Sequence, residues 1–457
     1  MPDMSILNLL HAFIAAKKAE SFSPEQIQEL QQKRFKKLLK HVLEKSRFYK
    51  RYYQEHGITE RDVDEVKPED LPIIDKQIMM QNYDDLVCDP ALKKVELERF
   101  INEFPDAGTN YKGVYKVIHT SGSSGTIGLF VYGPRDWVVA KVIGFRVAGL
   151  RTIPLKKSRL AFIGATDGHY ASITSIRNAP RLLFKTLPLS ISSPLEQICK
   201  DISHFHPDSM IGYASGIDLL AQEQLTGNIN ISPRKIWCMG EPLTPATRLN
   251  VEKAFNINPL NLYGTSETLS LAMDCNAHHR MHLFDDWFNI QIVDENIEPV
   301  NSGQPGRLVI TNLFNYTQPI IRYQMDDEII LSDEPCPCGW PFKVIDKIAG
   351  RSEEYLWFTK ADGTREFIHP LVLVEFIVRG LEKFQFIQTG TDRLTMKAVV
   401  HSQKSSILPA IHKRMTEILS QKALNDTVRF EVELVDDIKI NPKTGKFWLI
   451  IPYPNEL

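Results

Sequence analysis

The chain lacks the features that mark membrane, secreted or nucleic-acid-binding proteins. It contains no apolar run of the roughly 20 residues that a membrane-spanning helix needs, and its N-terminus has no signal-peptide layout. Its six cysteines are mostly scattered and make no disulfide scaffold, so we expect a reducing cytoplasm. The formal net charge of −2 provides no overall field that would attract nucleic acid or an anionic membrane, and we expect neither as a partner.

Internal repeats and low-complexity tracts are also absent. At 457 residues the chain is too long for one compact core, whereas its apolar content of 43% and charged content of 24% are ordinary for a globular protein. We place the domain boundary near Ala349-Gly350-Arg351. This divides the chain into a large part, 1–349, and a small part, 350–457.

Helical and strand patterns alternate along the large part. Residues 23–57 predict one long amphipathic helix that Ser23 caps, with Pro24 in its first turn and Gly57 at its end. A second helix start lies at Ser193-Pro194. Short β-rich runs lie between the helices, at 114–119, 129–132, 160–163, 235–238, 308–311 and 329–331. The predicted fold class is α/β, with a large N-terminal mixed α/β domain and a small, mobile α+β C-terminal domain.

The strongest local feature is the segment His119-Thr120-Ser121-Gly122-Ser123-Ser124-Gly125-Thr126. Its glycines let the backbone curl so that N–H groups converge on an anion, and its hydroxyls add further donors. It is not a Walker-type loop, because no Gly-Lys-Ser/Thr end follows and its flanks have strand character. On its own, the segment fits a flexible hairpin turn as well as a phosphate-binding loop.

Two later motifs carry weaker signals. In Tyr263-Gly264-Thr265-Ser266-Glu267 the aromatic ring could stack on a base, the threonine could bond a phosphate, and Glu267 could hold Mg²⁺. The motif Arg322–Asp327 ends in a carboxylate that, at a strand end, could accept both ribose hydroxyls. Taken alone, each motif is better explained as an ordinary strand-end turn or a surface acidic turn.

A glycine-lysine pair lies near the C-terminus, in Asn441-Pro442-Lys443-Thr444-Gly445-Lys446. A lysine in a short turn delivers a flexible cation that could neutralise a reacting carboxylate and an α-phosphate. A solvated lysine loop is the alternative explanation for such a stretch.

Together these motifs resemble the adenylate-forming superfamily, and within it the phenylacetate–CoA ligase family with its capsule-biosynthesis-like relatives. The resemblance covers nearly the whole chain and rests on the order and spacing of the motifs. They are Ser46–Lys50, Thr120–Thr126, Gly212–Ser215, Gly240–Leu243, Tyr263–Glu267, Arg322–Asp327, Gly350–Glu354 and Gly445–Lys446.

The resemblance implies an ATP-dependent, AMP-forming acid–thiol ligase. It would activate a carboxylic acid as acyl-AMP, release pyrophosphate and transfer the acyl group to a thiol, most readily coenzyme A. The small domain would rotate between the two half-reactions about Glu353. Lys446 would bridge the acyl carboxylate and the phosphate, with Lys443 as the other candidate cation.

The resemblance also implies which residues hold the nucleotide. The ATP phosphates would be held by Thr120, Ser121, Gly122, Ser123, Ser124 and Gly125. The adenine would be framed by Gly240, Glu241, Tyr263 and Gly264. Thr265 would contact the α-phosphate, Glu267 would hold Mg²⁺, and Asp327 would bind the ribose with support from Arg322.

A metal site is predicted from two Cys/His segments, Cys275-Asn-Ala-His278-His279-Arg-Met-His282 and Cys336-Pro-Cys338-Gly339. In a reducing compartment a Cys-x-Cys-Gly segment favours a metal half-site over a disulfide. Some members of the family have similarly placed residues, and Cys275, His282, Cys336 and Cys338 would make a closed set typical of structural zinc. His278 or His279 could replace His282, and buried cysteines beside a polar turn are the alternative.

The acyl pocket is expected beside Gly212–Ser215, and the candidate contacts are Phe162, Trp137, His169, Tyr170, Tyr213 and Ala214. These aromatic side chains would suit an aryl acid, although core packing explains each of them as well. Three functions stay open: a CoA ligase, an enzyme that hands its acyl group to an amine or a carrier-protein thiol, and a non-catalytic nucleotide-binding descendant. Retention of Glu267, Asp327 and Lys446 argues against the last. The sequence leaves open the acid, the acceptor and whether the chain forms a homodimer.

Overall fold

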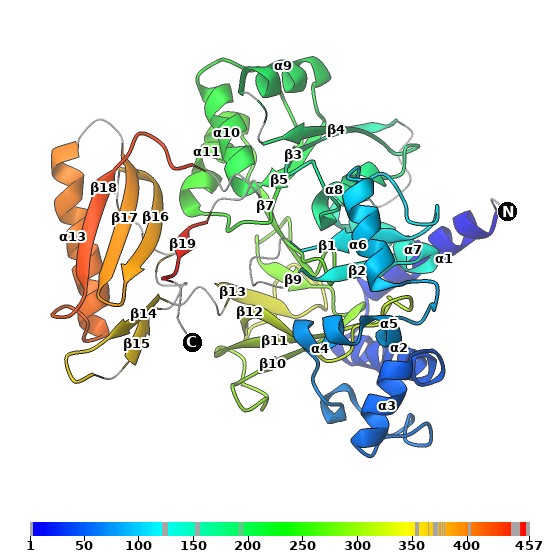
Figure 1. Cartoon of the computed structure of the whole chain (residues 1–457). Coiled ribbons are helices and arrows are strands. Elements are labelled where there is room, and N and C mark those ends of the chain that lie inside the picture. Colours follow the sequence, from blue (N-terminus) through cyan, green and yellow to red (C-terminus); the bar gives the residue numbers. More distant parts are fainter. Residues whose placement is uncertain are drawn as a thin grey trace.

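The structure is a computed structural model, and it describes residues 3–120, 127–150, 156–191, 193, 195–351, 356–363, 365–368, 373, 376, 378, 380–400, 404–439 and 448–453. Figure 1 shows the helices and strands of the N-terminal three-quarters gathered around one large sheet. A smaller group of elements, α13 and β14 to β19, lies beside it. No helix within these described ranges combines the length and the hydropathy that a bilayer crossing requires.

The large sheet has eleven strands in the order β10-β11-β12-β13-β9-β8-β7-β6-β5-β3-β4. Its parallel half consists of β3 (Ser158–Gly164), β4 (Phe184–Ser190), β5 (Ser209–Tyr213), β6 (Lys235–Met239) and β7 (Leu260–Tyr263). Parallel neighbours need crossover connections. Helices supply them: α8 (Ala171–Arg177), α9 (Leu195–Phe205), α10 (Ala214–Leu225) and α11 (Pro245–Phe255).

The antiparallel half of the same sheet follows in the chain. Its strands are β8 (Ala272–Asp274), β9 (Met281–Leu283), β10 (Phe288–Val293), β11 (Pro305–Asn312), β12 (Tyr323–Leu331) and β13 (Val344–Arg351). Because β9 pairs with β13, the last strand of this half returns to its centre. Residues of β8, β9 and the loop before β13 therefore come close together.

The N-terminal segment packs helices and a hairpin against the sheet. These elements are α1 (Asp3–Ala19), α2 (Pro24–Lys45), α3 (Arg47–Glu55), η1 (Pro68–Asp70), α4 (Lys76–Gln81), α5 (Tyr83–Leu86), α6 (Lys94–Glu103), β1 (Lys116–His119), β2 (Leu129–Tyr132) and α7 (Pro134–Val147). The apolar face of α2 is buried in the main core with side chains of both halves of the sheet.

The prediction of one helix over residues 23–57 is wrong, because the chain breaks at Ser46 into α2 and α3. Ser46 is extended (φ −98°, ψ 117°), and its hydroxyl accepts a hydrogen bond from the backbone N–H of Tyr49. A serine that caps a new helix can stop the previous one without any change in the apolar periodicity. The predicted cap at Ser23 and the predicted end near Gly57, which has φ +78°, are confirmed.

The C-terminal elements have a core of their own. They are β14 (Leu356–Thr359), β15 (Arg365–Ile368), β16 (Leu381–Gly390), β17 (Arg393–Val400), α13 (Lys404–Gln421), β18 (Arg429–Leu434) and β19 (Ile450–Ile451). Buried side chains from α13, β16 and β17 form a cluster that is separate from the main core. The predicted boundary at 349/350 falls near the end of β13, whose pairing with β12 reaches Arg351, and both that boundary and the mobility of this part remain predictions.

The mixed α/β fold class is confirmed. Five of the six short β-rich runs lie within strands, and the run 114–119 overlaps β1, which begins at Lys116. A helix begins at Leu195 beside the predicted start. One local expectation is wrong: Asp327 is not at a strand end but inside β12, opposite Arg351 of β13. The sequence pattern placed this carboxylate correctly on a strand but at the wrong position along it.

Candidate active site and metal centre

Three of the predicted motifs meet at one edge of the large sheet. The parallel strands β5, β6 and β7 pair so that Tyr213 lies opposite Met239, and Met239 opposite Leu262. The segments that directly follow these strands are therefore neighbours. In parallel sheets this carboxyl edge is where ligands bind. It gathers Tyr213-Ala214, Gly240-Glu241 and Tyr263-Gly264-Thr265, which lie far apart in the sequence.

Two glycines at this edge are required by their surroundings. Gly240 has φ +74°, and a Cβ there would also lie 3.1 Å from the ring of Tyr213. At Gly264 a Cβ would lie 2.1 Å from the carbonyl oxygen of Leu269, which no side chain permits. The turns after β6 and β7 can therefore take their observed paths only with glycine.

Glu241 and Tyr213 shape the start of α10. The backbone N–H of Ser215 donates to Oε2 of Glu241 at 2.8 Å, which fixes the turn after β6 against the first turn of the helix. Tyr213 is buried in edge-to-face contact with Phe162, with ring centroids 6.4 Å apart, and burial raises the pKa of Tyr213 to about 12. Ala214 begins α10 directly after it. Contact of these residues with an acyl group stays a prediction.

Glu267 is the buried carboxylate of the site, with 6% of its surface exposed. The hydroxyl of Tyr323, the first residue of β12, donates to Oε1 of Glu267 at 3.4 Å. Burial raises the pKa of Glu267; the charge of Asp327 adds to this shift, and the charge of Lys76 opposes it. The structure therefore brings the Tyr263–Glu267 motif and the Arg322–Asp327 motif into contact through Glu267 and Tyr323.

Arg322 lies at the entry to β12, with φ +48°. Its guanidinium donates to Oε1 of Gln291 at 3.3 Å and to the carbonyl of Leu71. Its own carbonyl accepts from the N–H of Ile74 at 3.1 Å, so it ties the segment before α4 to the sheet. These contacts hold β12 in position beside the site, and the predicted support of ribose binding remains a prediction.

Thr120 lies at the base of the predicted phosphate loop. Its N–H donates to the carbonyl of Gly128 at 3.0 Å, and its hydroxyl accepts from the N–H of Gly128 at 2.9 Å. This pair closes the hairpin base between β1 and β2. The remaining loop residues named from the sequence, Ser121, Gly122, Ser123, Ser124 and Gly125, lie outside the described residues, as do Glu353, Lys443 and Lys446.

A cavity of about 390 Å³ lies beside this edge, between α7 and one face of the parallel strands. Trp137 and Lys141 line it from α7, and Lys235, Trp237 and Met239 line it from alternate positions of β6. Leu269 and Ser270 line the part next to the Tyr263–Glu267 motif. Of the predicted acyl contacts, Trp137 lines this cavity. Its lining does not include Phe162, His169, Tyr170, Tyr213 or Ala214. The alternation in β6 was a signal for this face that the sequence analysis did not use.

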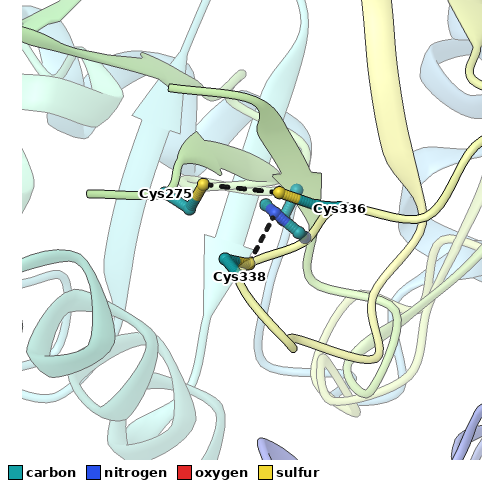
Figure 2. Close-up of side chains that lie close together, drawn as sticks. Cys275, Cys336 and Cys338 are labelled. Atoms are coloured by element: carbon teal, nitrogen blue, oxygen red, sulfur yellow. Dashed lines mark hydrogen bonds between the residues drawn. The ribbon is translucent and has the colours of Figure 1, made fainter. Parts of the chain in front are cut away.

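Four predicted metal ligands come together at the centre of the antiparallel half. Cys275 follows β8, His282 lies in β9, and Cys336 and Cys338 lie in the loop before β13. Their ligand atoms all lie within 4.8 Å of one another. Figure 2 shows Cys275, Cys336 and Cys338 converging on one point, with the sulfur atoms of Cys275 and Cys336 3.7 Å apart. His278 and His279 are not part of the cluster.

The contacts of His282 suit a metal ligand. Nδ1 lies 3.3 Å from the carbonyl oxygen of Phe342 and can donate its proton there, while Nε2 lies 3.3 Å from the sulfur of Cys338. Metal-binding histidines typically anchor one ring nitrogen on a carbonyl in this way and leave the other free to ligate. Burial also lowers the pKa of His282 to about 4, so the ring is neutral at physiological pH.

Comparison with known proteins finds relatives that match most of the chain. No protein-family model matches it. It is 25% identical to the phenylacetate-coenzyme A ligase of Escherichia coli, over 92% of each chain. It is 22% identical to Protein CapK of Staphylococcus aureus, over 92% of this chain and 88% of that protein. The chain is related to the phenylacetate–CoA ligases. This confirms the resemblance that the motifs carry.

A solved structure supports the same fold for this relative of the phenylacetate–CoA ligases. A 2-hydroxyisobutyryl-CoA ligase in its postadenylation state, bound to R3-HIB-AMP, superposes with a TM-score of 0.75. The match covers 96% of this chain and 92% of that ligase at 18% identity. The chain therefore has the adenylate-forming enzyme fold over nearly its full length, including the small C-terminal part.

Proposed function

We propose that this chain is an AMP-forming ligase that activates a carboxylic acid with ATP and transfers the acyl group to coenzyme A. The observation that carries the proposal is the contact between Glu267 and Tyr323, which joins the motifs of Glu267 and Asp327 beside the glycine-shaped carboxyl edge of β5 to β7. Support also comes from relatives that are phenylacetate-coenzyme A ligases by name, and from the ligase of the same fold whose structure holds an acyl-AMP.

The predicted roles fit the chemistry of adenylation. A carboxylate oxygen of the acid attacks the α-phosphorus of ATP, the bond to the bridging oxygen breaks, and pyrophosphate leaves. The buried carboxylate of Glu267 would hold Mg²⁺, which neutralises phosphate charge, and Thr265 would donate to the α-phosphate. Asp327 would accept the ribose hydroxyls, and Gly240-Glu241 with Tyr263 would frame the adenine.

The second half-reaction needs a different arrangement around the same site. The CoA thiol attacks the acyl carbon, the bond from that carbon to AMP breaks, and the thiol proton leaves to solvent. We propose that residues 350–457 turn as a unit about Glu353, carrying Lys446 to the site for adenylation and away from it for thioester formation. The separate core of the C-terminal elements supports movement as one body.

We further propose that the four-residue cluster holds structural Zn²⁺. For Zn–S bonds of about 2.3 Å, tetrahedral geometry sets neighbouring sulfurs about 3.8 Å apart. The observed separation of 3.7 Å between Cys275 and Cys336 fits that spacing and is far too long for a disulfide. Four protein ligands leave no position for catalysis. Reduced thiolates in this set agree with the cytoplasm as the location of the protein.

The test of the proposed function is acid-dependent ATP–pyrophosphate exchange with a panel of aryl and alkyl acids, run with Lys446→Ala alongside. Exchange that collapses in the variant supports adenylation by this chain. Thioester formation upon addition of CoA then separates a CoA ligase from an enzyme that uses a carrier-protein thiol or an amine. ATP binding without exchange for any acid would instead favour a non-catalytic nucleotide-binding protein.

A further inference from the structure

The cavity beside the nucleotide edge is long, and its two ends can be identified. At one end the rings of Trp137 and Tyr132 meet edge to face, with their centroids 6.1 Å apart. The hydroxyl of Tyr132 in turn donates to the carbonyl of Ser266 at 2.9 Å. This end therefore adjoins the Tyr263–Glu267 motif. At the other end Nζ of Lys235 donates to the carbonyl of Ala148 at 3.0 Å. The reacting carboxylate belongs at the first end.

The length of the cavity follows from the elements that line it. From Trp137 to Ala148 the α7 side spans about 16 Å at about 1.5 Å per residue. From Lys235 to Met239 the β6 side spans about 13 Å at about 3.3 Å per residue. A single aromatic ring fills only part of such a length. The small residues Ala140 and Gly144 on the helix face keep the middle of the cavity open, and a Cβ at Gly144 would meet nothing within 4 Å.

The charges in the wall are unbalanced. The charged lining residues are Lys141, Arg234, Lys235 and Asp208. Arg234 pairs with Asp208 at 3.5 Å, which leaves the wall with an excess of lysine. Lys141 projects from the middle of α7, about 6 Å beyond Trp137 along the helix axis at 1.5 Å per residue.

Lys141 is half-buried without a counter-charge. Within the described part of the chain, no hydrogen bond or ion pair involves its ammonium group, and the nearby Lys116 repels it. Burial lowers the pKa of Lys141, which reflects the loss of water around the charged form. An ammonium group in an apolar wall is disfavoured unless it is paired, so a ligand that brings an anion to this point gains affinity.

We propose that the acid activated by this chain is elongated and carries a second, distal anionic group that pairs with Lys141 inside the cavity. The proposal rests on the proposed function, because it assigns the first carboxylate to the adenylation site. The substrate class is then an aryl or alkyl dicarboxylate, or an acid with an equivalent second anion. Its apolar body packs between Trp137 and Trp237, with the ring of Trp237 also near Lys235.

The test compares ATP–pyrophosphate exchange for matched acids with and without a distal carboxylate. Suitable pairs are octanoate with suberate, hexanoate with adipate, and phenylacetate with 4-carboxyphenylacetate. In the unmodified protein we expect at least one diacid to exceed its monoacid in kcat/KM about tenfold or more, as a charged hydrogen bond implies. Lys141→Met should raise the KM for that diacid by a similar factor without raising the KM for the monoacid, while Lys141→Arg should retain the preference.

The controls separate failure of this inference from failure of the proposed function. Lys253→Met, at an exposed position of α11, should change the kcat/KM of neither the diacid nor the monoacid. Exchange that favours every monoacid and does not respond to Lys141→Met would overturn the inference and leave the proposed function standing. If no acid supports exchange, the proposed function fails. A titration of tryptophan fluorescence with diacid alone then decides the inference: saturable quenching that Lys141→Met abolishes supports it, and no quenching overturns it.

Discussion

The two halves of the large sheet present different kinds of site. The parallel half, β3 to β7, ends in turns whose backbone needs glycine, and its face borders an open cavity. The antiparallel half, β8 to β13, closes on itself through the pairing of β9 with β13 and gathers the four Cys/His ligands there. The parallel half leaves space for a ligand, whereas the four Cys/His residues of the antiparallel half connect its own strands and loop. Glu267 lies between β7 and β8, where the two halves meet, and it contacts Tyr323 of the strand that carries Asp327.

The largest effect should come from the carboxylate at that junction. Glu267→Gln keeps the shape of the side chain but removes the charge that would hold Mg²⁺. We expect kcat for pyrophosphate exchange to fall about 10²–10³-fold, the size typical for loss of one electrostatic contact in a transition state. Binding of ATP without metal should change little.

Pyrophosphate exchange as a function of Mg²⁺ concentration measures this effect. Glu29→Gln, an exposed glutamate of α2, is the matched control and should behave like the unmodified protein. Full activity of Glu267→Gln at ordinary Mg²⁺ would show that the junction of the two halves does not hold the metal.

The second effect should be confined to the antiparallel half. Cys275→Ser removes one ligand, so we expect the zinc content to fall from one ion per chain to none. Stability should fall by about 4 kcal/mol, the amount that a ligand present at a thousand times its Kd contributes. Metal analysis and urea unfolding measure the two quantities.

Cys199→Ser, a buried cysteine of α9 away from the cluster, is the control for this variant and should keep any bound zinc. If the unmodified protein contains no zinc after purification in zinc-supplemented medium, the cluster is simply a group of buried thiols. In that case the comparison between an open and a metal-fixed half no longer holds.

The sequence predicted the antiparallel half's cluster better than the parallel half's cavity, for a physical reason. Cysteine and histidine are rare residue types, and metal ligands often lie close together in the sequence. The pair Cys336-x-Cys338 could therefore be recognised as a metal half-site without the tertiary structure. The cavity is lined by single positions from separate elements, such as Lys141 and Trp237, and each one alone resembles core or surface. Only the pairing of the strands brings them to one face.

The two errors in the fold have different physical causes. The apolar periodicity of residues 23–57 continues across Ser46, so a helix pattern alone cannot reveal that a serine restarts the helix there. Asp327 was expected at a strand end because a carboxylate fixed there could accept both ribose hydroxyls. Its place inside β12, opposite Arg351, depends on pairing with a strand whose last residues lie 24 positions later in the chain. Apolar periodicity predicts the elements, whereas a local cap decides where this helix breaks and tertiary pairing decides which residues face a ligand.

The smallest effect should come from Gly144, which lines the cavity in the parallel half. Glycine inside a helix lowers stability by about 1 kcal/mol relative to alanine. Since a Cβ at this position would meet nothing within 4 Å, Gly144→Ala should raise the free energy of unfolding by about that amount. Ala140→Gly, one turn earlier on the same face, should lower it by a similar amount. Urea unfolding followed by tryptophan fluorescence measures both, and destabilisation by Gly144→Ala would mean that the space beside α7 is not open. If Gly144→Ala raises both the free energy of unfolding and the KM for long acids, the glycine keeps space for the ligand and lowers the stability of the helix.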